Sequence, residues 1–135
     1  MSLYVGASRR YKLGSALMAF LLWGSWAWYA NGADNEWHTL LSAIAQGSSS
    51  FLITLGLVAL VTRLYNHFEH PLARVWLPAL IVTALSSSVL LVVHLGVGTQ
   101  QIIQTILPPS TVAFLFCLFT TIKMQKTIRQ GVYDE

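Results

Sequence analysis

Charged residues are scarce in this sequence. Asp, Glu, Lys and Arg together make up 10% of the 135 residues, whereas apolar residues make up 55%. A water-soluble enzyme needs a charged surface around one apolar core, so this composition excludes that class. The single cysteine, Cys117, also excludes a disulfide scaffold and a zinc site built on cysteines.

Sequence motifs for nucleophilic catalysis and phosphate binding are absent as well. The chain contains no Gly-x-Ser-x-Gly, no phosphate-binding loop and no glycine-rich dinucleotide turn. Cys117 stands in the apolar sequence Phe-Leu-Phe-Cys-Leu-Phe, where a reactive thiolate is disfavoured. We therefore expect no catalytic residues, no enzymatic activity and no bound cofactor.

Four long apolar runs dominate what is present. They cover residues 13–30, 40–62, 75–98 and 102–122, and each reaches the ~18 residues that a helix needs to cross a bilayer. Helices are the expected form, because an open sheet leaves backbone groups unpaired in lipid and the runs lack the alternation of a membrane barrel. The sequence predicts an all-α, polytopic membrane protein, a single domain with four transmembrane helices in an up-down bundle.

Two alternatives stay open for the fourth run, because Pro108 and Pro109 lie near its start. The run is either one helix, or residues 102–107 form a separate interfacial or re-entrant turn and the spanning helix begins at Pro109. The second alternative leaves a short apolar stretch. It therefore requires the helix to continue past Lys123 or the bilayer to become locally thinner.

The basic residues all fall on one side of the predicted membrane. The eight Lys and Arg residues precede the first run, flank the link between the second and third, or follow the fourth: Arg9, Arg10, Lys12, Arg63, Arg74, Lys123, Lys126 and Arg129. The positive-inside rule places the N-terminus, this link and the C-terminus in the cytoplasm. The pI near 9.3 thus reflects topology, and the expected partner is the lipid bilayer of the plasma (inner) membrane, not nucleic acid.

In length and number of spans the chain resembles the small multidrug resistance transporters. The hallmark of that family is an acidic residue in the first span, whereas no Asp or Glu lies between Leu13 and Ala30 here. The one-sided basic residues also predict a single orientation in the membrane. No functional residue is transferred from the family to this chain.

Histidine is the candidate for proton chemistry at depth, because no Asp, Glu, Lys or Arg lies within the four runs. His94, near the outer end of the third run, is predicted either to form an interhelical hydrogen bond or to serve as a proton relay or substrate contact. His38 lies two residues outside the second run, at a different depth, so we expect no haem or metal held by this pair.

Two serine triplets are the most distinctive pattern. Ser48-Ser49-Ser50 lies in the second run and Ser86-Ser87-Ser88 in the third. Counted from the cytoplasmic ends of their runs, the triplets have equal depths, so antiparallel neighbouring helices are predicted to set them side by side as an inverted repeat. Gln46 and Thr54, one turn before and after Ser50, extend a polar stripe along the second helix.

Two hypotheses explain these serines: close packing of the helices, or a polar pathway through the membrane. Small residues four apart, Ala43 with Gly47 and Ala84 with Ser88, favour close helix packing. The hydroxyl groups instead line a path for substrate or water in the second hypothesis.

Trp23 and Trp26 share one face of the first helix. Two roles stay open for them: they contact lipid and other helices, or they bind a quinone or a cation through the ring face.

The sequence predicts a transporter or permeation subunit for a neutral or amphiphilic small molecule. The alternative is a non-catalytic accessory subunit that packs against a larger membrane enzyme or transporter through the serine-rich face. Four helices enclose little volume, so we expect either a homo-oligomer or a larger membrane protein partner.

Overall fold

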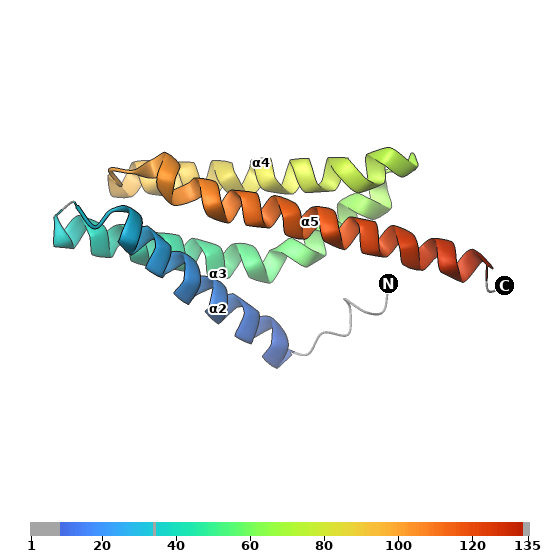
Figure 1. Ribbon diagram of the computed structural model, residues 1–135, viewed down its shortest axis with the longest axis horizontal. Helices are drawn as coiled ribbons and strands as arrows, with labels where there is room; N and C mark the ends of the chain where they lie inside the picture. Colours follow the sequence, from blue (N-terminus) through green and yellow to red (C-terminus); the bar gives the residue numbers. More distant parts are fainter. Residues whose placement is uncertain (1–8, 34, 134–135) are drawn as a thin grey trace.

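Four helices make up the described part of the chain in the computed structural model (Figure 1). The structure describes residues 9–33 and 35–133, with residues 132 and 133 described by their backbone alone. The helices are α2 (Arg9–Ala30), α3 (Glu36–His67), α4 (Pro71–Val97) and α5 (Ile102–Tyr133). The prediction of an all-α fold is confirmed.

Successive helices run in opposite directions and pack side by side (Figure 1). α3 packs against both α2 and α4, and α5 packs against α4, with fewer contacts from α5 to α2 and α3. Because the described links are short, each helix returns along the one before it.

Three of the helices, α3, α4 and α5, are long and apolar enough to cross a membrane. α2 is not among them, although its 22 residues give it sufficient length. The charged residues Arg9, Arg10 and Lys12 at its start, and the tryptophan, tyrosine, glycine and serine residues that follow, lower its hydropathy. Membrane-spanning length and composition are therefore confirmed for three of the four predicted spans.

α5 is one continuous helix that passes through Pro108 and Pro109 and continues beyond Lys123 to Tyr133. The alternative of a separate turn over residues 102–107 is therefore wrong. A proline removes one backbone N–H from the helix, but the helix persists where the freed carbonyl finds another donor.

The helix ends follow local chemistry. Asn35 precedes α3, and its Oδ1 accepts a hydrogen bond from the Trp37 N–H at 2.8 Å. Pro71 occupies the first turn of α4, where its missing N–H has no helical partner to lose. Gly98 caps the C-terminal end of α4 with a φ of 80° that suits glycine, and the N–H groups of Gly98 and Thr99 both donate to the His94 carbonyl.

Close approach of α2 and α3 depends on two glycines. A Cβ atom on Gly47 would lie 3.0 Å from the Phe20 carbonyl oxygen, and one on Gly24 would lie 3.2 Å from the Ala43 carbonyl oxygen. α2 thus packs closely against the small pair Ala43 and Gly47 of α3, as membrane helices do at small residues. Ala84 and Ser88 are exposed instead, so the helix packing predicted for them is not found.

Charge separates the two ends of the bundle. All eight Lys and Arg residues lie toward the end where α2 begins, α3 joins α4 and α5 finishes (Figure 1). We name this the basic end, and the other the opposite end. An apolar core toward the basic end joins α3, α4 and α5 through Val61, Ala79, Val82 and Cys117.

Candidate functional site

Buried polar side chains gather toward the opposite end of the bundle. They come from α3, α4, α5, the turn that follows α2 and the link between α4 and α5. We name this set the polar network, and its members are Asn31, Thr39, Ser42, Gln46, Ser50, His94, Thr99 and Thr105.

α3 contributes half of the polar network from one face. Thr39, Ser42, Gln46 and Ser50 follow one another every three or four residues, a spacing that aligns side chains along one side of a helix. All four are buried. A polar stripe on α3 therefore faces the interior of the bundle.

His94 joins α4 to this stripe. Its Nε2 lies 2.7 Å from Gln46 Oε1, and the Gln46 amide nitrogen donates to Ser50 Oγ at 3.1 Å. A carbonyl oxygen only accepts, so Nε2 carries the proton and donates to Gln46. In the neutral imidazole, Nδ1 is then an acceptor, and it lies 2.7 Å from Thr99 Oγ1.

The hydroxyl groups complete a chain with one direction. Thr99 donates its single proton to His94, so the Ser42 hydroxyl, 2.8 Å away, must donate to Thr99. Donors point in sequence from Ser42 through Thr99, His94 and Gln46 to Ser50. Buried hydrogen bonds that satisfy one another in this way rigidify the elements they join, here α3, α4 and the link after α4.

Asn31 forms the second centre of the polar network. Its Nδ2 donates to the Ala27 carbonyl at 2.9 Å and to Thr105 Oγ1 at 2.8 Å. Its Oδ1 accepts from the Gln101 N–H at 3.0 Å, and its carbonyl accepts from Thr39 Oγ1 at 2.7 Å. One side chain thus joins the end of α2 to the first turn of α5, where backbone N–H groups have no helical acceptor.

A third link between α2 and α5 comes from an indole. Trp26 Nε1 donates to the Gln104 carbonyl at 3.0 Å. That carbonyl has no helical donor, because Pro108, four residues later, lacks an N–H. The Trp26 ring also lies against Tyr29, with a centroid separation of 5.7 Å. Trp23, on the same helix, is half-buried.

The serine triplets bond separately within the described structure. Ser86 donates to the Val82 carbonyl at 2.8 Å and Ser88 to the Ala84 carbonyl at 2.7 Å, which are both one turn earlier in α4. Ser87 donates to Ser110 Oγ of α5 at 2.8 Å. In the first triplet, Ser50 is buried, Ser49 half-buried and Ser48 exposed, and Thr54 one turn further is half-buried.

The contacts between α3 and α4 set a different register from the one the sequence predicts. Gln46 is paired with His94, and the Tyr65 carbonyl accepts from Arg74 Nε. This register puts Ser50 near the level of Leu90, so the two triplets are offset by about 6 Å, or one turn. The expected side-by-side arrangement is wrong because it assumed that the two apolar runs end at one depth.

Sequence reasoning missed most of the polar network. Gln46, Ser50 and His94 were candidates, but Asn31, Thr39, Ser42, Thr99 and Thr105 were not. The spacing of Thr39 and Ser42 with Gln46 was the available signal. His38, two residues before the second apolar run, lies in the first turn of α3 and is exposed.

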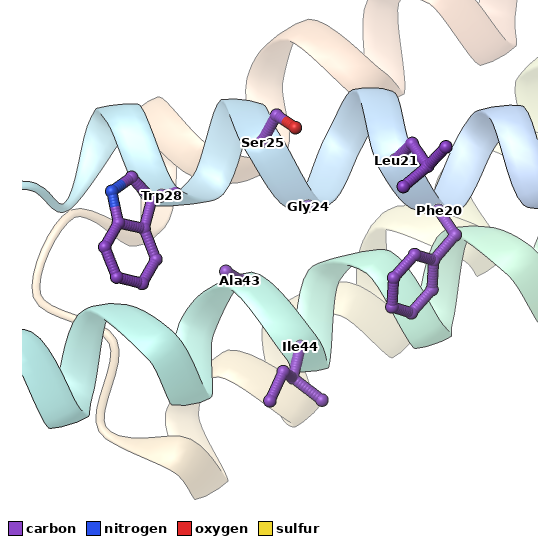
Figure 2. A pocket seen from close by; sticks show the side chains of 7 residues that line it. All are labelled: Phe20, Leu21, Gly24, Ser25, Trp28, Ala43 and Ile44. Carbon is purple, nitrogen blue, oxygen red and sulfur yellow. The ribbon is translucent and has the colours of Figure 1, made fainter.

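A hollow on the lateral surface lies between α2 and α3 (Figure 2). It has a volume of about 330 Å³ and is open to the outside. Figure 2 shows Trp28 and Phe20 toward its two ends, with Gly24 and Ala43 facing each other between them. We name it the lateral groove, and its lining residues are Phe20, Leu21, Gly24, Ser25, Trp28, Ala43 and Ile44.

Neither metal ligands nor known relatives identify the protein. Among the described residues, no three His, Cys, Asp or Glu side chains are grouped so as to hold a metal ion. Comparisons with protein families, curated proteins and solved structures give no match for this chain. The polar network and the lateral groove are therefore the features of the described residues that bear on function.

Proposed function

We propose that this protein is a multi-pass protein of the plasma (inner) membrane in which α2 crosses the bilayer beside α3, α4 and α5. The 22 residues of α2 extend about 33 Å at 1.5 Å per residue, which matches the thickness of the hydrocarbon core. The close contact of Gly24 with α3 supports a shared environment for the two helices. The basic end then faces the cytoplasm with both chain ends.

We further propose that it works as a non-catalytic accessory subunit that packs against a larger membrane enzyme or transporter. The observation that carries this proposal is the contrast between interior and lateral surface. Inside, the side chains of the polar network bond one another. On the lateral surface, an apolar groove between α2 and α3 is open.

The polar network suits a structural role. A pathway for a polar solute needs groups that replace the water around it. Here the imidazole of His94 uses both ring nitrogens for Gln46 and Thr99, and the Asn31 amide bonds three neighbours. These groups hold the helices in position, and this fixed scaffold shapes the lateral groove.

The lateral groove suits a transmembrane helix of a partner. Its middle is made of the small residues Gly24, Ser25 and Ala43, between the larger Phe20 and Trp28. Helices in lipid associate through van der Waals packing against small residues, because lipid offers no hydrophobic driving force between them. Side chains of a partner helix are therefore the occupant we propose.

A groove-filling substitution tests this proposal. Ser25→Leu places a branched side chain in the lateral groove, whereas Ser48→Leu makes the same change at an exposed site of α3 outside it. In mild detergent extracts of native membranes, we expect the wild-type chain and Ser48→Leu to migrate in a complex well above the mass of the chain. Ser25→Leu is expected to lose that complex. Equal migration of the two variants contradicts the proposal.

The second candidate function is a transporter or permeation subunit for a neutral or amphiphilic small molecule. The volume of the lateral groove, about 330 Å³, favours it, because small-molecule sites occupy roughly 300–1,000 Å³. Uptake of an amphiphilic dye by vesicles that contain this chain alone, lost in Ser25→Leu and kept in Ser48→Leu, supports this function over the accessory one.

A further inference from the structure

We propose that a cleft at the basic end binds the phosphate group of an anionic phospholipid. The cleft has a volume of about 140 Å³ and lies between the end of α3, the start of α4 and the last third of α5. Its lining residues are Tyr65, Pro71, Arg74, Gln125, Ile128 and Arg129. The inference rests on the proposed membrane placement, which puts this cleft at the cytoplasmic leaflet.

Arg74 is held in the cleft by Tyr65. Its Nε donates to the Tyr65 carbonyl at 3.3 Å, and its Cζ lies 4.9 Å from the centre of the Tyr65 ring. These contacts fix the guanidinium plane through Nε and one face. The two terminal Nη groups form the planar fork that binds two oxygens of a phosphate group.

The other walls of the cleft fit the same ligand. Arg129 brings a second guanidinium group from α5, and Gln125, one turn earlier, brings an amide. Pro71 lines the cleft and lies in the first turn of α4, so the positive end of that helix dipole adjoins the cleft. The N-cap residue His70 makes no side-chain capping bond. Ile128 adds an apolar wall for the part of the lipid beyond the phosphate.

Lipid is the source of phosphate that the position favours. All eight basic residues lie toward this end, and Lys and Arg near an anionic leaflet are attracted to its headgroups. A non-specific electrostatic attraction to the leaflet would be weakened equally by the loss of any one of these charges. A specific site instead depends on the two arginines that line the cleft, which gives the proposal its test.

The test uses three variants that each remove one positive charge. Arg74→Gln and Arg129→Gln change the cleft, whereas Arg63→Gln changes an exposed arginine of α3 outside it. Binding of dioleoylphosphatidylglycerol and dioleoylphosphatidylcholine to the purified full chain is measured by native mass spectrometry. Thermal unfolding temperatures, measured in the same detergent, establish that each variant is folded. Arg129 is exposed, so Arg129→Gln keeps the test open if Arg74→Gln does not fold.

We expect the wild-type chain to bind phosphatidylglycerol more tightly than phosphatidylcholine. Each cleft variant is expected to weaken phosphatidylglycerol binding about tenfold, as for loss of a charge-assisted hydrogen bond, and Arg63→Gln to leave it within about twofold. Equal weakening in all three variants, or equal binding of the two lipids, overturns the proposal.

A second arm separates lipid from soluble phosphate. Millimolar inorganic phosphate is expected to leave the phosphatidylglycerol complex intact. Displacement of the lipid by inorganic phosphate shows that the cleft binds the free ion and overturns the lipid assignment. Because binding is measured in detergent, it does not depend on membrane orientation, and cysteine labelling of the two bundle ends in cells tests the orientation separately.

Discussion

The indole of Trp26 donates a hydrogen bond to the carbonyl of Gln104 at 3.0 Å, across 78 positions of the chain. The acceptor is the carbonyl that Pro108 leaves without a donor in α5. An unpaired backbone carbonyl in lipid destabilises the fold by roughly several kcal/mol. A side chain of α2 thus compensates a proline in α5, and this contact helps α5 to remain one helix.

Trp26→Phe removes this donor while it keeps an aromatic ring. We expect the free energy of unfolding in detergent to fall by about 1–3 kcal/mol, because the Gln104 carbonyl loses its partner. Pro108→Ala restores a helical N–H, so the loss caused by Trp26→Phe should become smaller in the double variant. Equal losses in the two backgrounds would mean that the indole does not serve this carbonyl.

His94 and Gln46 should be energetically coupled. His94→Leu leaves Gln46 Oε1 without its donor, whereas Thr99 Oγ1 keeps its contact with Ser42. We expect the variant to destabilise the fold by about 1–3 kcal/mol for the buried group left unpaired. In a double-mutant cycle with Gln46→Leu, measured by unfolding in detergent, the double variant should lose less than the sum of the single variants. Additive losses contradict the hydrogen bond. Ser48→Ala, at an exposed site on α3, is the control and should change stability little.

Asn31→Ala should loosen the start of α5. The Gln101 N–H donates to Asn31 Oδ1, and Thr105 Oγ1 accepts from Asn31 Nδ2. Hydrogen exchange followed by mass spectrometry should therefore show faster exchange in peptides that contain Gln101 to Thr105. Asn66→Ala, at an exposed position in α3, should leave that exchange unchanged. Unchanged protection in Asn31→Ala would remove Asn31 from its role as the junction.

Gly47→Ala should separate α2 from α3. Its new Cβ would lie 3.0 Å from the Phe20 carbonyl oxygen, a backbone atom that moves only with the helix. Gly56→Ala in the same helix meets nothing within 4 Å, and it should stabilise α3 by up to about 1 kcal/mol through helix propensity. Spin-label distances between α2 and α3 should increase in Gly47→Ala alone. Equal distances in both variants contradict the close approach.

Hydrophobic runs predict the helices better than their ends. The apolar runs indicate each helix, but α5 continues through Lys123 to Tyr133 because polar residues extend a helix once its apolar part is fixed. The continuity of α5 through Pro108 could not be predicted, because the donor to the carbonyl that Pro108 leaves unpaired is Trp26, which is far away in sequence.

The candidate site was predictable only within one helix. The spacing of Gln46 and Ser50 indicates a shared face of α3, since helical periodicity is local. Their neighbour His94 depends on the register between α3 and α4, which distant contacts such as Arg74 with Tyr65 determine. Asn31 directly follows the first apolar run, and a single polar residue there resembles a turn until its partners Gln101 and Thr105, at the start of α5, are known.

The most direct test of the proposed function is photo-crosslinking from the lateral groove in native membranes. A benzophenone side chain placed at Ser25 or Ile44 lies in the groove, whereas one at the exposed Leu115 of α5 lies outside it. We predict that both groove positions join this chain to one and the same larger membrane protein, and that Leu115 does not. Crosslinks from Ser25 and Ile44 to lipid alone, or to a second copy of this chain, would contradict the accessory-subunit proposal.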